Sequence, residues 1–452
     1  MLNIQSDSRK IKNGDIFVAV KCEVNDGHQY IEKAIENGAT KIIAERGEYS
    51  VPTLIVKDTR KYLEQYLKEN YNKYLDEMTI IGITGTNGKT TSAYLIYQSL
   101  NKLGIKTAYI GTIGFFLEDK VMNLPNTSVD ICDTYDLFMK AYDAGYKTVV
   151  METSSHALYN GRLKTINFDY AIFTNLTQDH LDYHKTMDNY ALAKQILFKS
   201  LKKDGIAIIN NDDNYKKYFL LEQNKNITYG FEKSDYIISD VQMNNQGSSF
   251  KLNNLNIQTK LIGRYNIYNL VDAIVLLKQM KINDKGIEEV VKDLNPPAGR
   301  MDKIEYKTNS IIIDYAHTPD GLENFISTVK EFVTGNIYIV FGCTGDRDRI
   351  KRPIMTDIVG KYAKYFIITN DDPHFEDSNQ IVNDMTKEYQ EKNYEICLDR
   401  KQAIEKGINM LKENDVLLIL GKGHEEFMII GREKIPFNDK KVVLSYLEEL
   451  SN

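Results

Sequence analysis

Short apolar runs, each followed by a polar or glycine-rich turn, recur along most of the chain, and they predict buried β-strands. In the middle of the chain, helical stretches separate most of these runs. The alternation predicts a mostly parallel sheet covered on both faces, with ligands bound beyond the carboxyl ends of its strands. The predicted strands of this region are residues 80–83, 107–110, 148–151, 170–173 and 206–209.

A smaller α/β unit precedes this region. Its predicted strands are residues 15–20, 41–44 and 53–56, and its predicted helix is residues 30–37. A polar, helix-prone segment at residues 57–77 then leads into the central region. We therefore expect a first domain over residues 1–76 and a second domain from residue 77 onward.

A second interruption separates the central region from the last third of the chain. Residues 227–261 are rich in Asn and Ser and contain short runs of alternating apolar and polar residues, which predict an antiparallel appendage. A helix is expected over residues 267–280. Asn295, Pro296 and Pro297 then break regular structure. This break predicts domain limits of 77–298 and 299–452. The last domain repeats the α/β pattern with predicted strands at residues 310–314, 337–341, 366–369 and 416–420.

Composition agrees with several folded domains and excludes some classes of protein. A chain of 452 residues is too long for one ordinary core, and its hydrophobic content of 42% is that of a soluble globular protein. The net charge of −6 leaves no basic surface for nucleic acid or an anionic membrane. No apolar run approaches the roughly 20 residues of a membrane span. Four dispersed cysteines, Cys22, Cys132, Cys343 and Cys397, predict no disulfides and a cytoplasmic protein.

The strand at residues 80–83 leads into a glycine-rich loop and then a predicted helix at residues 92–100. This order is typical of a polyphosphate site, because loop N–H groups and the positive helix end face the phosphates. Lys89 adds a charge, and the Thr90 hydroxyl can reach Mg²⁺. The strict P-loop pattern fails at Ile83, so a structural turn without nucleotide is the alternative. The loop residues are Gly85, Thr86, Asn87, Gly88, Lys89, Thr90 and Thr91.

Polar residues follow two further strands that are expected beside this loop. Glu152 and His180 could complete the shell of a phosphate-bound Mg²⁺, and the alternative is that both serve turns and helix caps. Lys194 is the only charge in an apolar helix at residues 190–198. Taken by itself, this pattern favours a lysine that extends its ammonium group to the surface.

Arginine and aspartate gather in three clusters of the last third, at residues 299–301, 314–320 and 342–349. Arginine presents two parallel N–H donors, which suits the recognition of carboxylate or phosphate. A solvated loop with surface ion pairs is the alternative.

Together these motifs resemble the Mur ligases, from Asp7 to Phe437, and most of all the branch that adds a diamino acid. The resemblance implies an α/β protein of three domains: a small N-terminal domain, a central P-loop ATPase domain and a C-terminal Rossmann-like domain. It implies an ATP-dependent, Mg²⁺-dependent amide ligase of peptidoglycan precursor synthesis, and thus of cell shape and division. The implied substrates are UDP-N-acetylmuramoyl-L-alanyl-D-glutamate and L-lysine, L-ornithine or meso-diaminopimelate. The expected protein is a monomer without membrane insertion.

The resemblance also assigns residues to four groups. Catalytic roles fall on Lys89, Glu152, His180 and Lys194, and Lys194 matches a carbamylated lysine of the family. Metal ligands would be Thr90, Glu152, His180 and the carbamate of Lys194. ATP would contact residues 85–91 together with Asn266, Asn269, Arg300, Asp314 and His317. The muramoyl-dipeptide nucleotide would contact Ser8, Asn126, Thr127, Ser128, Ser154, Asn160 and Arg162.

The expected amino-acid pocket departs from the family pattern. Its residues would be Arg347, Asp371, Asp372, Pro373, His374, Gly421 and Glu425. The family's Asp-Asn-Pro-Arg, in enzymes that use diaminopimelate, is here Asp-Asp-Pro-His. His374 lacks the double donor of arginine, and Asp372 adds negative charge, so the sequence favours L-lysine or L-ornithine unless Arg347 or Arg349 compensates.

Three other functions are weighed against this one. A folylpolyglutamate-synthase-like ligase would share the ATP loop but lack the Asp7-Ser8-Arg9 domain. A catalytically silent nucleotide-binding scaffold would be expected to lose Lys89, Glu152 or Lys194, and all three are present. A Mur-type ligase of a secondary pathway would use the same chemistry on another acceptor.

Overall fold

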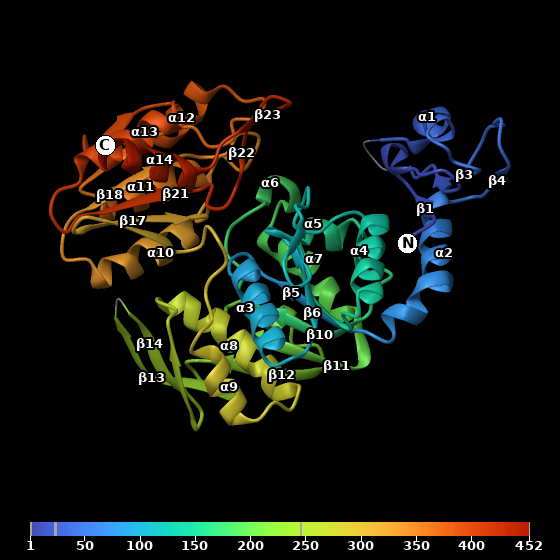
Figure 1. The fold of residues 1–452 in the computed structure, drawn as a ribbon, viewed down its shortest axis with the longest axis horizontal. Helices are drawn as coiled ribbons and strands as arrows, with labels where there is room; N and C mark the ends of the chain where they lie inside the picture. Colours follow the sequence, from blue (N-terminus) through green and yellow to red (C-terminus); the bar gives the residue numbers. More distant parts are fainter. Residues whose placement is uncertain (1, 22–24, 245, 452) are drawn as a thin grey trace.

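The computed structural model describes residues 2–21, 25–244 and 246–451, and it has three α/β units (Figure 1). The N-terminal unit and the C-terminal unit lie on opposite sides of the central one in this view. The predicted fold class is therefore confirmed. Within the described residues, no helix has both the length and the apolar character that crossing a membrane requires.

The N-terminal unit is a parallel sheet of four short strands in the order β1-β2-β3-β4. Its helix α2 is long, and Leu63 and Leu67 on that helix share one hydrophobic core with Ile80 and Tyr135 of the central unit. The N-terminal unit is thus packed onto the central one. Its elements are β1 Ile4–Gln5, β2 Ile16–Val18, β3 Lys41–Ala44, β4 Thr53–Ile55, α1 Ile31–Glu36 and α2 Thr59–Leu75, with short 3-10 turns at Ser8–Lys10 and Gly27–Tyr30.

The central unit is built on one large sheet with the order β15-β14-β13-β12-β11-β10-β5-β9-β6-β7-β8. Strands β12, β11, β10, β5, β9 and β6 are parallel. Its strands are β5 Thr79–Thr84, β6 Thr107–Gly111, β7 Gly114–Phe116, β8 Lys120–Met122, β9 Thr148–Glu152, β10 Phe168–Phe173, β11 Leu201–Asn210, β12 Lys225–Gly230, β13 Tyr236–Asn244, β14 Gly247–Leu252 and β15 Leu255–Thr259. Its helices are α3 Lys89–Lys102, α4 Ile131–Asp143, α5 Ser155–Tyr159, α6 Leu181–His184, α7 Met187–Lys199, α8 Arg264–Gln279 and α9 Asp284–Val291.

The antiparallel appendage begins later than the sequence predicted. Residues 227–230 belong to β12, which pairs in parallel with β11 and so extends the main sheet. Only β13, β14 and β15 form the antiparallel part. The prediction failed at its first strand because short alternating runs do not reveal which neighbour a strand will pair with.

The C-terminal unit repeats the architecture with the sheet order β16-β17-β21-β18-β19-β20, in which only the edge strand β16 is antiparallel. Its strands are β16 Asp302–Tyr306, β17 Asn309–Asp314, β18 Ile337–Phe341, β19 Tyr365–Ile368, β20 Tyr394–Ile396 and β21 Val416–Leu420, followed by the hairpin β22 Phe427–Ile430 and β23 Glu433–Pro436. Its helices are α10 Pro319–Phe332, α11 Lys351–Tyr362, α12 Ser378–Thr386, α13 Arg400–Met410 and α14 Asp439–Ser451.

The domain limits at residues 76 and 298 remain predictions, although each lies between two of these sheets. Cys22 lies outside the described residues. Cys132, Cys343 and Cys397 are free thiols.

Candidate active site

A cavity of about 1040 Å³ opens between the central and C-terminal units. It is lined by the loops that follow β5, β9 and β10 on one side and β17, β18, β19 and β21 on the other. The carboxyl ends of two parallel sheets therefore contribute to one site. This is the position where sheets of this class bind ligands.

The glycine-rich loop enters the cavity from the end of β5. Gly88 has φ of 85°, a conformation that favours glycine, and helix α3 begins directly after it at Lys89. The Lys89 ammonium folds back onto the loop and donates to the carbonyls of Gly85 at 3.0 Å and Thr86 at 2.8 Å. Burial lowers the pKa of Lys89, and Glu152 opposes that shift. The loop is thus arranged around a lysine, as the sequence predicted.

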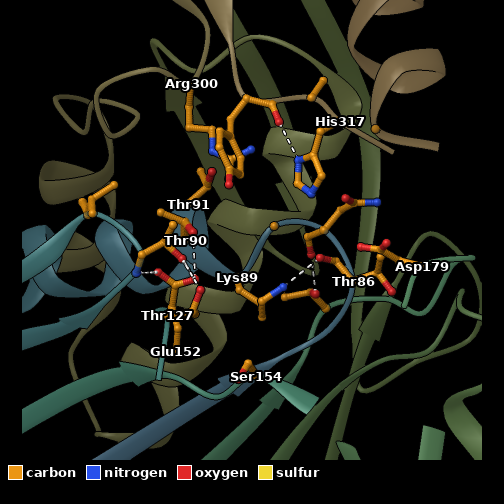
Figure 2. A pocket seen from close by; sticks show the side chains of 18 of the residues that line it. Thr86, Lys89, Thr90, Thr91, Thr127, Glu152, Ser154, Asp179, Arg300 and His317 are labelled. Carbon is orange, nitrogen blue, oxygen red and sulfur yellow. Dashed lines mark hydrogen bonds between the residues drawn. The ribbon is translucent and has the colours of Figure 1, made fainter. Parts of the chain in front are cut away.

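Glu152 ends β9 and is fully buried beside the loop (Figure 2). Its Oε2 accepts a hydrogen bond from Thr90 Oγ1 at 2.8 Å, and its Oε1 accepts one from the Thr112 backbone N–H at 2.8 Å. The Tyr109 hydroxyl also donates to Oε1. Hydroxyl and carboxylate oxygens are the ligands that Mg²⁺ prefers, so the convergence of Thr90 and Glu152 fits a magnesium ion.

Lys194 corrects the prediction of a surface-directed side chain. It is only 1% exposed, and its Nζ donates to the Gly85 carbonyl at 2.7 Å. The side chain points inward because α7 packs against the sheet beside the ATP loop. Burial, and then the nearby charge of Lys89, hold the pKa of Lys194 well below its ordinary value. An unprotonated amine is the form that reacts with CO₂, so the environment suits carbamylation.

His180 lies in a cluster of rings next to Lys194. Its ring centroid is 4.9 Å from that of His156 and 6.0 Å from that of Tyr190. Burial lowers the pKa of His180 and favours the neutral imidazole, which is the form that binds metals. His180 has φ of 54°, an uncommon conformation outside glycine, and Asp179 Oδ1 accepts its backbone N–H at 2.9 Å.

The C-terminal unit contributes Arg300 and His317, which lie above the loop in Figure 2, and Asp314, which lines the same cavity. Asp314 accepts the backbone N–H of Met301 at 2.8 Å, which ties the segment after the second predicted boundary to the end of β17. The Arg300 guanidinium lies 4.5 Å from the centre of the Tyr315 ring. From the central unit, Asn266 and Asn269 of α8 also line the cavity.

The residues expected to hold the muramoyl-dipeptide lie next to Glu152, with two exceptions. Ser128 Oγ donates to the Glu152 carbonyl at 2.9 Å and accepts the Ser154 N–H at 2.9 Å. Arg162 donates to the Ser128 carbonyl at 3.3 Å, and Asn126 and Thr127 line the same cavity. Asn160 is outside the lining, and Ser8 lies buried in the N-terminal unit.

The expected amino-acid pocket contains a buried cation that the sequence analysis missed. Lys422 is fully buried, and its Nζ lies 2.8 Å from Asp372 Oδ1, 2.7 Å from Glu425 Oε2 and 3.8 Å from Asp371 Oδ1. Burial raises the pKa values of Asp371 and Glu425, and Lys422 opposes both shifts. One lysine is thus shared by three acidic side chains, so Asp372 has a cationic partner but the cluster is not neutralised as a whole. The prediction that Asp372 adds negative charge to the pocket stays a prediction, although its carboxylate is held by Lys422.

Two arginines near this pocket differ in their partners. Arg349 forms an ion pair with Glu376 at 2.9 Å, whereas Arg347 has no ion pair or hydrogen bond to any described residue and lines the cavity. His374 and Gly421 also line it, and Pro373 does not. His374 has φ of 51°, and its backbone N–H donates to the Ile429 carbonyl at 3.1 Å. Arg347 is thus the free guanidinium of this side of the cavity.

Some site residues had a signal in the sequence and others had none. Lys422 stands in Gly-Lys-Gly-His-Glu directly after a buried strand, a pattern of the same type as the ATP loop. Tyr109 lies inside an apolar strand and gives no sign that its hydroxyl reaches Glu152.

Comparisons with known proteins agree over nearly the whole chain. Residues 2–82 match the Mur ligase family, catalytic domain; residues 83–277 match the Mur ligase middle domain; and residues 299–423 match the Mur ligase, glutamate ligase domain. The UDP-N-acetylmuramoyl-L-alanyl-D-glutamate--2,6-diaminopimelate ligase of Bacillus cereus is 40% identical over 97% of this chain and 92% of its own.

Two solved structures have the same fold. A UDP-N-acetylmuramoyl-L-alanyl-D-glutamate--2,6-diaminopimelate ligase is 31% identical, with a TM-score of 0.68 over 100% of this chain and 96% of its own. MurF ligase from Thermotoga maritima, in complex with ADP, has a TM-score of 0.73 over 100% of this chain and 98% of its own at 20% identity.

Proposed function

The chain belongs to the Mur ligase family, and we propose on this basis that it joins a diamino acid to UDP-N-acetylmuramoyl-L-alanyl-D-glutamate, with ATP as the energy source. One observation carries the proposal: a single cavity contains the ATP loop, the Thr90–Glu152 pair and the carboxylate cluster around Lys422. A nucleotide-binding scaffold would need the loop but not the other two groups. The named relatives are ligases of the same substrate nucleotide.

In the first step, the terminal phosphate of ATP passes to the substrate carboxylate and forms an acyl phosphate with release of ADP. Lys89 leaves the carbonyls of Gly85 and Thr86 and donates to the phosphates, and loop N–H groups bind their other oxygens. Arg300 and His317 enclose the nucleotide from the C-terminal unit. Residues from both units then keep water away from the acyl phosphate.

Thr90, Glu152 and His180, with the carbamate of Lys194, would hold Mg²⁺, which supplies charge neutralisation for the phosphoryl group. Two of these metal-binding groups are already held in place in the structure. Glu152 is held by Tyr109 and Thr112, and Lys194 is kept as a free amine by burial. Carbamylation turns that amine into an anion in a site where a cationic ammonium would be poorly solvated.

In the second step, the amine of the diamino acid attacks the acyl phosphate, and phosphate leaves from the tetrahedral intermediate. Glu425 and Asp371 hold the incoming ammonium group by charge-assisted hydrogen bonds. Lys422 forms ion pairs with both carboxylates and offsets part of the repulsion between them.

We propose meso-diaminopimelate as the diamino acid, in place of the L-lysine or L-ornithine that the sequence favoured. Asp372 is paired with Lys422, which weakens its repulsion of a distal carboxylate. Arg347 is a guanidinium without a partner among the described residues, and it lines the same cavity as His374. The names of the relative from Bacillus cereus and of the solved structure agree with this choice.

The proposal places the protein in the cytoplasm as a step of peptidoglycan precursor synthesis, since ATP and a UDP-linked precursor are the substrates. Ser8 and the N-terminal unit would bind the uridine end, while Asn126, Thr127, Ser128, Ser154 and Arg162 would hold the dipeptide end. Asn160 would act from outside the cavity. The expected monomer stays part of this proposal.

Phosphate release from ATP tests the function directly. The assay contains UDP-N-acetylmuramoyl-L-Ala-D-Glu and either meso-diaminopimelate, L-lysine or L-ornithine, with Lys89→Met as the inactive control. Turnover with diaminopimelate is the expected result, and product mass identifies the new amide. Turnover with only L-lysine or L-ornithine would contradict the choice of diaminopimelate and support the substrate that the sequence favoured. If none of the three amino acids supported turnover, the remaining hypotheses would be a catalytically silent scaffold and a ligase of a secondary pathway.

A further inference from the structure

Lys351 forms an ion pair that crosses from the C-terminal unit to the central unit. It is the first residue of α11, and its Nζ lies 3.6 Å from Asp179 Oδ1. The side chains of Lys351 and Asp179 are 9% and 8% exposed. Among the residues that the structure describes, no other ion pair joins these two units. Removing one partner of such a buried pair is costly, because it leaves the other charge uncompensated where little water screens it.

Asp179 occupies a central position in the site. It lies on the opposite side of Lys89 from Glu152 (Figure 2). Its carboxylate accepts the His180 N–H at 2.9 Å and lies 3.4 Å from His180 Nε2. It is also close enough to raise the pKa values of Lys89 and Lys194 against the effect of their burial. Asp179 is therefore close to both lysines of the phosphoryl-transfer site.

A second contact between the same two units touches the ATP loop itself. At the start of α10, Asp320 Oδ2 accepts a hydrogen bond from Asn87 Nδ2 at 2.9 Å. Thr318 Oγ1 donates to Asn87 Oδ1 at 3.2 Å. The C-terminal unit thus rests on the loop at Asn87 and on Asp179. Of these contacts, the one made by Lys351 places a positive charge beside Asp179, whereas Asp320 contributes a carboxylate that contacts the neutral Asn87.

We propose that Lys351 is a positioning residue. It links the docking of the C-terminal unit against the central unit, here called seating, to the electrostatics of phosphoryl transfer. When the unit is seated, Lys351 balances Asp179, and Lys89 is free to move to the phosphates. When the unit is displaced, Asp179 loses this partner and attracts Lys89 instead. The proposal rests on the proposed ligase function, because phosphoryl transfer is the step that it controls.

Lys351→Met tests this role by removing the charge while keeping much of the length and apolar stem. We expect kcat to fall about 10- to 100-fold, the scale of breaking one buried charge pair, with the KM for the diamino acid changed less than threefold. Lys351→Arg should retain most of the activity. Lys361→Met is the matched control, because Lys361 lies in the same helix with a side chain that is 60% exposed.

A double-mutant cycle identifies the partner. If Lys351 acts through Asp179, then Lys351→Met combined with Asp179→Asn should be no slower than Asp179→Asn alone. Additive losses would show that Lys351 acts elsewhere, and a kcat within twofold of the native value in Lys351→Met would refute the proposal. Melting temperatures of all variants separate these outcomes from failure to fold.

Small-angle X-ray scattering gives a readout that does not depend on ligase activity. We expect a larger radius of gyration for Lys351→Met than for the native protein, and a native value for Lys351→Arg. Identical scattering of Lys351→Met and native protein would overturn the seating role. If the native protein formed no amide with any substrate, the proposed function would fail, while the scattering comparison would still decide whether Lys351 seats the unit.

Discussion

The Tyr315 hydroxyl donates a hydrogen bond to Glu425 Oε1 at 3.3 Å. The same ring lies under the Arg300 guanidinium, so one partly buried side chain contacts an expected ATP residue and an expected amino-acid residue. Its hydroxyl forms a hydrogen bond with Glu425, and its ring packs against the guanidinium of Arg300. The two functions of Tyr315 can therefore be separated by a substitution that removes only the hydroxyl.

Tyr315→Phe should raise the KM for the diamino acid about three- to tenfold, because a hydrogen bond to a carboxylate contributes on the order of 1 kcal/mol or slightly more. The KM for ATP should stay within twofold of the native value, since the phenyl ring still packs under Arg300. Steady-state kinetics with each substrate varied in turn measures both. Equal effects on the two KM values would show that the ring position, rather than the hydroxyl, had changed.

Arg347→Ala should raise the KM for meso-diaminopimelate about 10- to 100-fold, because a charge-assisted hydrogen bond to the distal carboxylate would be lost. Any slow turnover of L-lysine should be unchanged, since that amino acid has no distal carboxylate. Arg349→Ala is the control, because Arg349 is already paired with Glu376. If Arg349→Ala raised the KM for meso-diaminopimelate more than Arg347→Ala did, Arg349 and not Arg347 would be the residue that binds the distal carboxylate.

The ATP loop could be predicted from the sequence because its chemistry is local. Gly85, Gly88 and Lys89 are close in the chain, and strand, loop and helix follow in order. The pairing of Asp372 with Lys422 could not be predicted in the same way. These residues are 50 positions apart, and they meet only because β19 and β21 both pair with β18. The sign of charge in a pocket depends on such distant partners.

Lys194 shows a second limit of prediction from pattern. A single lysine in an apolar helix extends to the surface when the helix lies at the surface, and it is buried when the helix is covered on that side. Here α7 presents Lys194 to the ATP loop, where it contacts the Gly85 carbonyl. Only the family resemblance indicated this orientation, and the residues by themselves favoured the opposite one.

Lys194→Ala should reduce turnover by at least about 100-fold, the scale of losing a group that stabilises charge in the transition state. Formate or acetate should restore part of the activity, because a small carboxylate can occupy the space of the lost carbamate. Lys199→Ala, at the exposed end of the same helix, is the control. Near-native turnover of Lys194→Ala without added carboxylate would exclude the carbamate role.

Asp272 provides a test of stability that is independent of the ligase assay. It is 1% exposed, Ser92 Oγ donates to its Oδ2 at 2.7 Å, and its Oδ1 has no hydrogen-bond partner in the described part of the chain. Burial raises the pKa of Asp272 from 3.8 to about 7. The folded state therefore favours the protonated acid. Its contribution to stability is complete below pH 3.8 and is lost as the pH rises through about 7.

Asp272→Asn should consequently melt at a higher temperature than the native protein at pH 8. The free-energy difference implied by this pKa shift is roughly 4 kcal/mol, as an upper estimate. The advantage should shrink steadily between pH 7 and pH 4, because the native carboxyl is then protonated in the folded state at less cost. Differential scanning calorimetry across this range measures the effect, with Asp204→Asn at an exposed position as the control. A difference between variant and native protein that did not change with pH would show that Asp272 is ionised in the folded state.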